Sequence, residues 1–160
     1  MAIGEVIMSP KYFDDWVQDE EFLTPTRTMT ETDVVMFAAM SGDYNELHTS
    51  AEATKNNQFG RRIVHGLLGL AVSHGLLFRT GYLEGTAIAF MSVDGWNFKA
   101  PIYFGDTIHV KGKIVEKKAS KSKTDRGIIK FYLEILNQNG IVVQSGFKTI
   151  MMKREEPNKA

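Results

Sequence analysis

The sequence contains no cysteine, and this absence excludes several kinds of site. Without thiols the chain has no disulfides, no thiolate metal ligands and no cysteine nucleophile. A cysteine-free chain fits a reducing compartment. The first apolar residues, Ile3 to Met8, are interrupted by Glu5, so they do not form the apolar core of a signal peptide. Together these features predict a cytoplasmic protein.

Neither an excess of one charge nor a long hydrophobic run is present. The 19 basic and 19 acidic residues cancel, which removes any general attraction to nucleic acid or to an anionic membrane. No apolar run approaches the ~20 residues of a membrane span. The 160 residues are 43% hydrophobic and 24% charged, as in ordinary globular proteins. We therefore expect one domain over residues 1–160, with a core over about 24–152 and a polar tail at 153–160.

The first half of the chain carries helical signals. Thr30 and Asp33 form a capping box before a predicted helix of about two turns, which Gly42 is placed to end. Residues 66–78 are apolar nearly all round, which predicts a helix buried on most sides. Glycines 66, 69 and 75 weaken that helix by roughly 1 kcal/mol each relative to alanine. We expect close packing against a sheet to compensate.

The second half has the period-two pattern of strands. Long strands are predicted over residues 87–100, 108–114, 129–136 and 141–152, and a short edge strand over 24–29 contains Pro25. Short connections between the long strands favour an antiparallel sheet. The fold class predicted is α+β, with this sheet wrapped around the apolar helix. Such a sheet leaves an edge and a face exposed, which pairing of two subunits would cover.

Two short segments carry groups suited to chemistry. Asp43 and His48 lie on one loop, and a carboxylate beside an imidazole can bind and activate a water molecule. The structural alternative, which is commoner for such a pair, is that Asp43 caps a turn and His48 is a hydrogen-bonded, partly buried side chain. His65 and Gly66 open the apolar helix, whose first N–H groups suit a developing oxyanion. The alternative for Gly66 is tight packing against the sheet.

Histidine and aspartate side chains can bind metal ions, but their spacing in this sequence does not match a known metal-binding motif. His48, His65 and His74 show neither His-x3-His nor HExxH spacing. We predict no metal and no other cofactor. His74 lies inside the apolar helix, where a buried, hydrogen-bonded core histidine is the usual case.

Several segments together resemble the MaoC-like dehydratases, the family of the (R)-specific enoyl-CoA hydratases. They are residues 37–48 (FAAMSGDYNELH), 59–60 (FG), 63–68 (IVHGLL), 100–101 (AP) and 104–108 (FGDTI). The resemblance extends over about residues 24–151, and the combination of Gly-Asp-x-Asn-x-x-His with a downstream His-Gly is specific. It implies the hot-dog fold, in which an antiparallel sheet wraps a long helix.

The resemblance also implies a function. Asp43 and His48 would be catalytic, and Gly66, His65 and Asn45 would bind the substrate and its oxyanion. The reaction would be the reversible syn addition of water to a trans-2-enoyl thioester, giving an (R)-3-hydroxyacyl thioester. The implied partners are an acyl-CoA substrate and a second subunit, in a homodimer or an assembly of dimers.

The chain departs from the family pattern at three positions, one of which is Thr54, where a small residue is expected six positions after His48. Glu46 replaces a proline, and His74 replaces a small residue that often lines the pocket, which would change the pocket's polarity. Two rival functions stay open: a hot-dog acyl-CoA thioesterase, with water attacking the carbonyl carbon, and a non-catalytic acyl-thioester-binding subunit. The sequence does not specify the length, branching or carboxylation of the acyl group, or CoA against acyl carrier protein.

Overall fold

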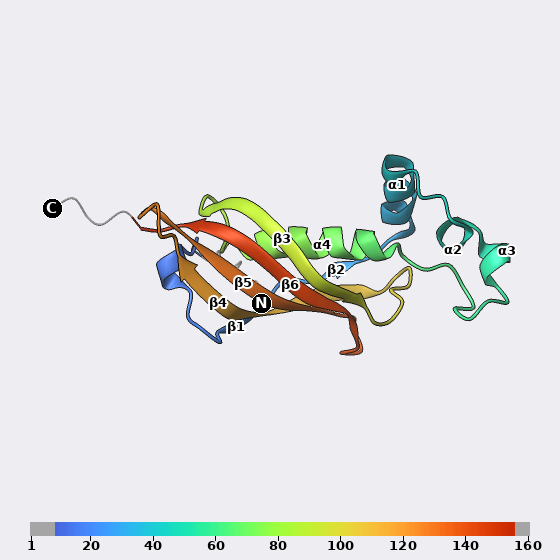
Figure 1. Cartoon of the computed structure of the whole chain (residues 1–160). Coiled ribbons are helices and arrows are strands. Elements are labelled where there is room, and N and C mark those ends of the chain that lie inside the picture. Colours follow the sequence, from blue (N-terminus) through green and yellow to red (C-terminus); the bar gives the residue numbers. More distant parts are fainter. Residues whose placement is uncertain (1–8, 156–160) are drawn as a thin grey trace, which may run out of the picture.

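A computed structural model describes residues 9–155, in which one curved antiparallel sheet wraps one long helix (Figure 1). The helices are η1 (Phe13–Asp15), α1 (Glu31–Ser41), α2 (Glu46–Thr49), α3 (Ala51–Thr54) and α4 (Gly66–Phe78). The strands are β1 (Glu21–Leu23), β2 (Arg27–Thr28), β3 (Ala87–Phe98), β4 (Thr107–Ala119), β5 (Arg126–Leu136) and β6 (Val142–Lys153). In the described part of the chain, no helix has the length and apolar character needed to cross a membrane.

The sheet has the strand order β1-β4-β5-β6-β3, and β2 also pairs with β4. The four long antiparallel strands and the α+β class are confirmed. Of the short strand predicted over residues 24–29, only β2 forms, and β1 precedes both this range and Pro25. Proline has no N–H to donate to a neighbouring strand, so a break in pairing at Pro25 is expected. The edge strand β3 ends the sheet on the other side.

Helix α1 sets the position of the loop that follows it. The Thr30 hydroxyl accepts a hydrogen bond from the Asp33 N–H, and the Asp33 carboxylate accepts one from the Thr30 N–H, as the predicted capping box requires. The helix is about three turns long rather than two. It ends at Gly42, whose φ of 79° is left-handed, as predicted. Helices α1, α2 and α3 lie beyond the N-terminal end of α4 (Figure 1).

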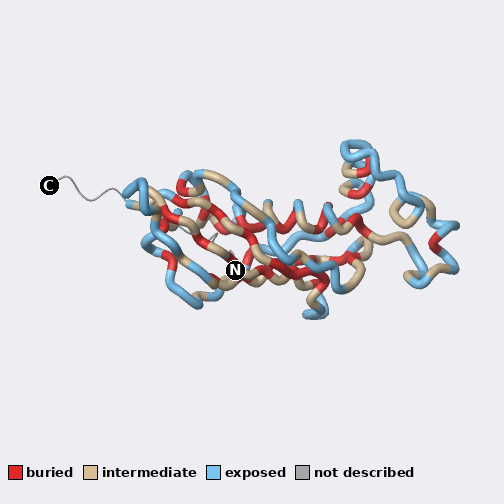
Figure 2. The backbone as a smooth tube through the Cα atoms, in the orientation of Figure 1, coloured by how far each residue is buried: buried red, intermediate tan, exposed pale blue. Residues whose placement is uncertain are grey.

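Helix α4 begins and ends where the sequence predicts, but it is less buried than predicted. Leu68, Val72 and Leu76 face the core, whereas Leu67 is 62% exposed. One stripe of α4 is exposed along its length: Leu67, Ala71, Gly75 and Phe78. The edge strand β3 exposes further apolar side chains: Ile88, Phe90, Met91 and Val93. Figure 2 shows buried and exposed positions alternating along α4, whereas β3 has only exposed and partly buried positions. An apolar stripe of α4 and an apolar strand edge are thus uncovered in a single chain.

The glycines of α4 differ in their surroundings. A Cβ atom at Gly69 would lie 2.4 Å from Gln144 Nε2 and 2.8 Å from Ile102 Cδ1, and one at Gly66 would lie 2.8 Å from the Phe98 ring. At Gly75 a Cβ atom would meet nothing within 4 Å. The expected packing against the sheet is therefore confirmed for Gly66 and Gly69 and is wrong for Gly75.

This difference predicts opposite effects of two substitutions in one helix. Gly75→Ala should raise the free energy of unfolding by about 0.5–1 kcal/mol, because alanine is the better helix former and its methyl group meets no atom within 4 Å in the single chain. Gly69→Ala should lower it by about 1–3 kcal/mol, because the methyl group displaces Gln144 and Ile102. Urea denaturation at one protein concentration measures both. Shifts in the same direction would contradict the assignment of helix packing to Gly69.

Candidate functional site

Helix α2 positions His48. The Asn45 side chain caps this helix by accepting a hydrogen bond from the Leu47 N–H at 2.9 Å. His48 Nδ1 lies 2.8 Å from the Ile63 carbonyl oxygen. A carbonyl can only accept, so Nδ1 carries a hydrogen, and in the neutral ring Nε2 keeps its lone pair. Asn45 thus orients the helix that carries His48, and its predicted role in binding substrate stays a prediction.

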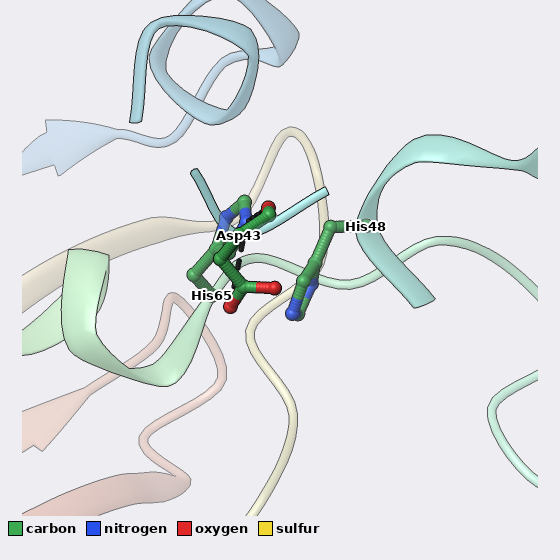
Figure 3. Close-up of side chains that lie close together, drawn as sticks. All are labelled: Asp43, His48 and His65. Carbon is green, nitrogen blue, oxygen red and sulfur yellow. Dashed lines mark hydrogen bonds and ion pairs between the residues drawn. The ribbon is translucent and has the colours of Figure 1, made fainter. Parts of the chain in front are cut away.

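Asp43 combines a structural contact with a free carboxylate oxygen. Its Oδ1 accepts a hydrogen bond from the Asn45 N–H at 3.2 Å, so the alternative of a turn cap is correct for this atom. Its Oδ2 lies 4.0 Å from His65 Nε2, and half of the side chain is exposed. Figure 3 shows the carboxylate beside the His48 ring. One oxygen thus fixes the loop while the other remains available for chemistry.

His65 joins the two segments of the site. Its Nε2 donates a hydrogen bond to the Asp43 carbonyl oxygen at 2.9 Å, and its ring stacks on the His48 ring with centroids 3.7 Å apart. The side chain is almost fully buried, and burial lowers the pKa of His65, so the neutral ring is favoured. His65 therefore holds Asp43 in place through a hydrogen bond and His48 in place through ring stacking, and neither of its ring nitrogens faces solvent.

Asp43, His48 and His65 bring one ligand atom each within 4.8 Å of one another. Two groups at this separation can share one water molecule, because each hydrogen bond to it spans about 2.7–3.0 Å. The same atoms are of types that bind metal ions. However, each histidine already commits one nitrogen to a carbonyl, and the remaining nitrogen of His65, Nδ1, is buried without a partner among residues 9–155. The geometry therefore suits a water molecule better than an ion.

A pocket of about 490 Å³ opens beside these residues, a size typical of small-molecule sites. Its wall includes Asp43, His48, Gly66, Phe98, Lys99 and Pro101. Gly66 is the first residue of α4, and the His65 side chain does not cap that helix, so the helix N-terminus is available to a ligand oxygen. A Cβ atom at position 66 would lie 2.8 Å from the Phe98 ring, which explains the glycine sterically as well. The packing interpretation of Gly66 is therefore confirmed, and its role in binding an oxyanion stays a prediction.

The sequence analysis missed Gln144, which lies in the pocket wall. Gln144 is 2% exposed, its Nε2 donates to the Gly66 carbonyl oxygen at 3.0 Å, and its Oε1 accepts from Trp96 Nε1 at 3.0 Å. This side chain fixes the first peptide of α4 against the sheet. A single amide within the apolar start of β6 was the available signal.

Comparisons with known proteins agree on one family. A family model described as "MaoC like domain" matches residues 16–131. Protein MaoC of Klebsiella aerogenes is 37% identical over 101 residues, which are 63% of this chain and 30% of that protein. The chain thus spans less than a third of the length of Protein MaoC. An (R)-specific enoyl-CoA hydratase of Rhodospirillum rubrum is 30% identical over 122 residues, which are 74% of this chain and 81% of that protein.

Solved structures show the same fold. The monoamine oxidase regulatory protein from "Archaeoglobus fulgius" superimposes with a TM-score of 0.84 at 29% identity, over 94% of this chain and 99% of that one. A Mycobacterium tuberculosis protein with a double hotdog fold superimposes with a TM-score of 0.77 at 16% identity, over 94% of this chain and 46% of that one. The described chain therefore has the hot-dog fold that the resemblance implied.

Proposed function

The chain belongs to the MaoC-like dehydratase family, and on this premise we propose that it is an (R)-specific enoyl-CoA hydratase and 3-hydroxyacyl-CoA dehydratase. Its matched relatives bear names such as (R)-specific enoyl-CoA hydratase and 3-hydroxybutyryl-CoA dehydratase. One observation carries the proposal: the Asp43 carboxylate, the His48 imidazole and the start of α4 at Gly66 line one pocket.

In the proposed reaction, Asp43 and His48 hold one water molecule between them. The water oxygen attacks C3 of the trans-2-enoyl thioester while one of the two side chains takes its proton. The electrons of the double bond move toward the thioester carbonyl, and the Gly66 N–H stabilises the resulting enolate oxygen. A proton is then delivered to C2, so one water is added and no thiol leaves. Both side chains contact the same water molecule in this scheme, so the base is not assigned to a single residue.

We propose that the active form is a homodimer that pairs through β3 and the exposed stripe of α4. Both carry uncovered apolar side chains, such as Phe90 and Leu67. An unpaired strand edge and an apolar helix stripe are both covered when two copies associate by two-fold symmetry. Phe98, at the end of β3, is 55% exposed and also lines the pocket, so such an interface would lie next to the site.

The proposal predicts which bond of an enoyl-CoA ester changes. With crotonyl-CoA and its longer, branched and carboxylated analogues, wild-type protein should remove the ultraviolet absorbance of the enoyl thioester without releasing free thiol. The two signals are followed in parallel wells, absorbance in one and a thiol reagent in the other. Buffer and heat-inactivated protein are the controls.

Each alternative function gives a different pattern in the same assay. If free thiol appears at the same rate as the absorbance is lost, the protein is a thioesterase and not a hydratase. Binding of the esters without any turnover across the whole panel would identify an acyl-thioester-binding subunit. Either pattern would overturn the proposed hydration.

A further inference from the structure

Strand β6 carries a lysine in the interior of the protein. Lys148 is 1% exposed, its Nζ donates a hydrogen bond to Ser73 Oγ at 2.9 Å, and it lies 5.3 Å from the centre of the Trp96 ring. Within residues 9–155 no carboxylate forms an ion pair with it. Burying an ammonium group without a counter-charge is costly, so the position calls for an explanation.

A second polar side chain near Lys148 has a buried nitrogen without a hydrogen-bond partner in the described chain. His74 Nδ1 is buried and makes no hydrogen bond within the described chain. The prediction that His74 is a hydrogen-bonded core residue is therefore wrong for this nitrogen. The centre of its ring lies 5.2 Å from the centre of the Phe78 ring and 4.8 Å from that of Phe90 on the edge strand. Burial and then the nearby Lys148 lower the pKa of His74, and burial lowers the pKa of Lys148 to about 7. An anion between the two side chains would relieve both effects.

This cluster lies along the helix that begins at the pocket. Gly66, Leu70 and His74 are spaced four residues apart, so they form one row on α4, about 12 Å long at 1.5 Å per residue. On β6, Gln144 contacts Gly66, and Lys148 lies four residues further on the same face of the strand. Trp96 contacts both of these β6 side chains. Figure 1 shows β3 and β6 running beside α4.

We propose that Ser73, His74 and Lys148 bind a carboxylate at the far end of the substrate's acyl chain. The inference rests on the proposed function and narrows it to trans-2-enoyl thioesters of dicarboxylic acids. With the thioester carbonyl at Gly66, the acyl chain follows the row past Leu70, and its terminal carboxylate meets the Lys148 ammonium. Ser73 donates its hydroxyl once it exchanges its bond to the Leu70 carbonyl for one to the ligand. The carboxylate supplies the counter-charge that the protein itself does not.

The test uses pairs of enoyl-CoA esters of equal length that end in a methyl group or a carboxylate. A charge-assisted hydrogen bond strengthens binding by about 10- to 150-fold. At the chain length that brings the carboxylate to Lys148, kcat/KM should therefore be higher for the carboxylate ester by this factor. In Lys148→Met the ratio of kcat/KM for the carboxylate ester to kcat/KM for the methyl ester should fall to one or below, because methionine offers the carboxylate no ammonium group. Lys130→Met, at a lysine over the Phe147 ring on the neighbouring strand, should leave the ratio unchanged.

Two results would overturn the inference: a wild-type preference for the methyl ester at every length, or an undiminished carboxylate preference in Lys148→Met. If no ester is hydrated at all, the proposed function fails, and binding decides the inference separately. Calorimetry with saturated acyl-CoA pairs then compares the two termini. Tighter binding of the carboxylate by wild type, lost in Lys148→Met, would support the site, and equal affinities would refute it.

Discussion

Asp43→Asn and His48→Gln should each lower kcat for enoyl-CoA hydration by about 10²- to 10⁴-fold, the usual contribution of a positioned acid or base. Asparagine keeps the shape of Asp43 and can still accept the hydrogen bond from the Asn45 N–H, but it cannot take a proton from water. Glutamine at position 48 can still donate to the Ile63 carbonyl and lacks the basic nitrogen. Initial rates of absorbance loss under saturating substrate measure the effect.

The same loop provides a matched control. Glu46 is an exposed acid in the first turn of α2, so Glu46→Gln removes a nearby negative charge without touching the Asp43–His48 pair. This variant should keep kcat within about threefold of wild type, since surface charges act weakly. All variants should show wild-type melting temperatures. Wild-type kcat in Asp43→Asn or in His48→Gln would remove that residue from the proposed mechanism.

Combining the two substitutions tests whether they act as one unit. If Asp43 and His48 hold the same water molecule, losing either one disables it, and the double variant should be little slower than the slower single variant. Independent roles would instead multiply the two losses. Single-turnover rates distinguish these outcomes even when steady-state activity is too low to follow.

The parts of the fold set by local signals were predictable from the sequence. The capping box at Thr30, the left-handed end at Gly42 and the bounds of α4 each depend on residues within a few positions of one another. The period-two pattern identified the long strands for the same reason. The motif also located Asp43 and His48 on one loop, where the structure brings them together.

Contacts between distant segments were not predictable in this way. Gln144 is 78 residues from Gly66 in the chain, and Lys148 is 75 residues from Ser73, so no local pattern joins either pair. A lysine within a strand is usually assigned to the solvent side, because lysine is almost never fully buried. His74 illustrates the same limit: its missing hydrogen bond depends on what β3 and β6 place around it.

Lys148→Met should raise the free energy of unfolding near pH 7, by an amount that shrinks as the pH rises. Burial lowers the pKa of Lys148 from 10.5 to about 7 in the folded protein. Between these two values the unfolded chain binds a proton that the folded chain does not, so the lysine's contribution to stability increases with pH. Its cost is greatest below pH 7, on the order of 5 kcal/mol, and vanishes above pH 10.5. Methionine fills similar space without a charge, so it removes this cost.

Denaturant titrations at several pH values between neutral and alkaline measure the gap, which is the difference in the free energy of unfolding between wild type and Lys148→Met. Lys148→Arg is the matched control, because arginine keeps its charge throughout and should be less stable than wild type by a margin that grows with pH. A gap between wild type and Lys148→Met that is independent of pH would mean that the lysine does not change its protonation on folding. Adding a saturated dicarboxylic acyl-CoA ester should narrow the gap at neutral pH. The ligand's carboxylate would pair with the ammonium in wild type and find no partner in Lys148→Met.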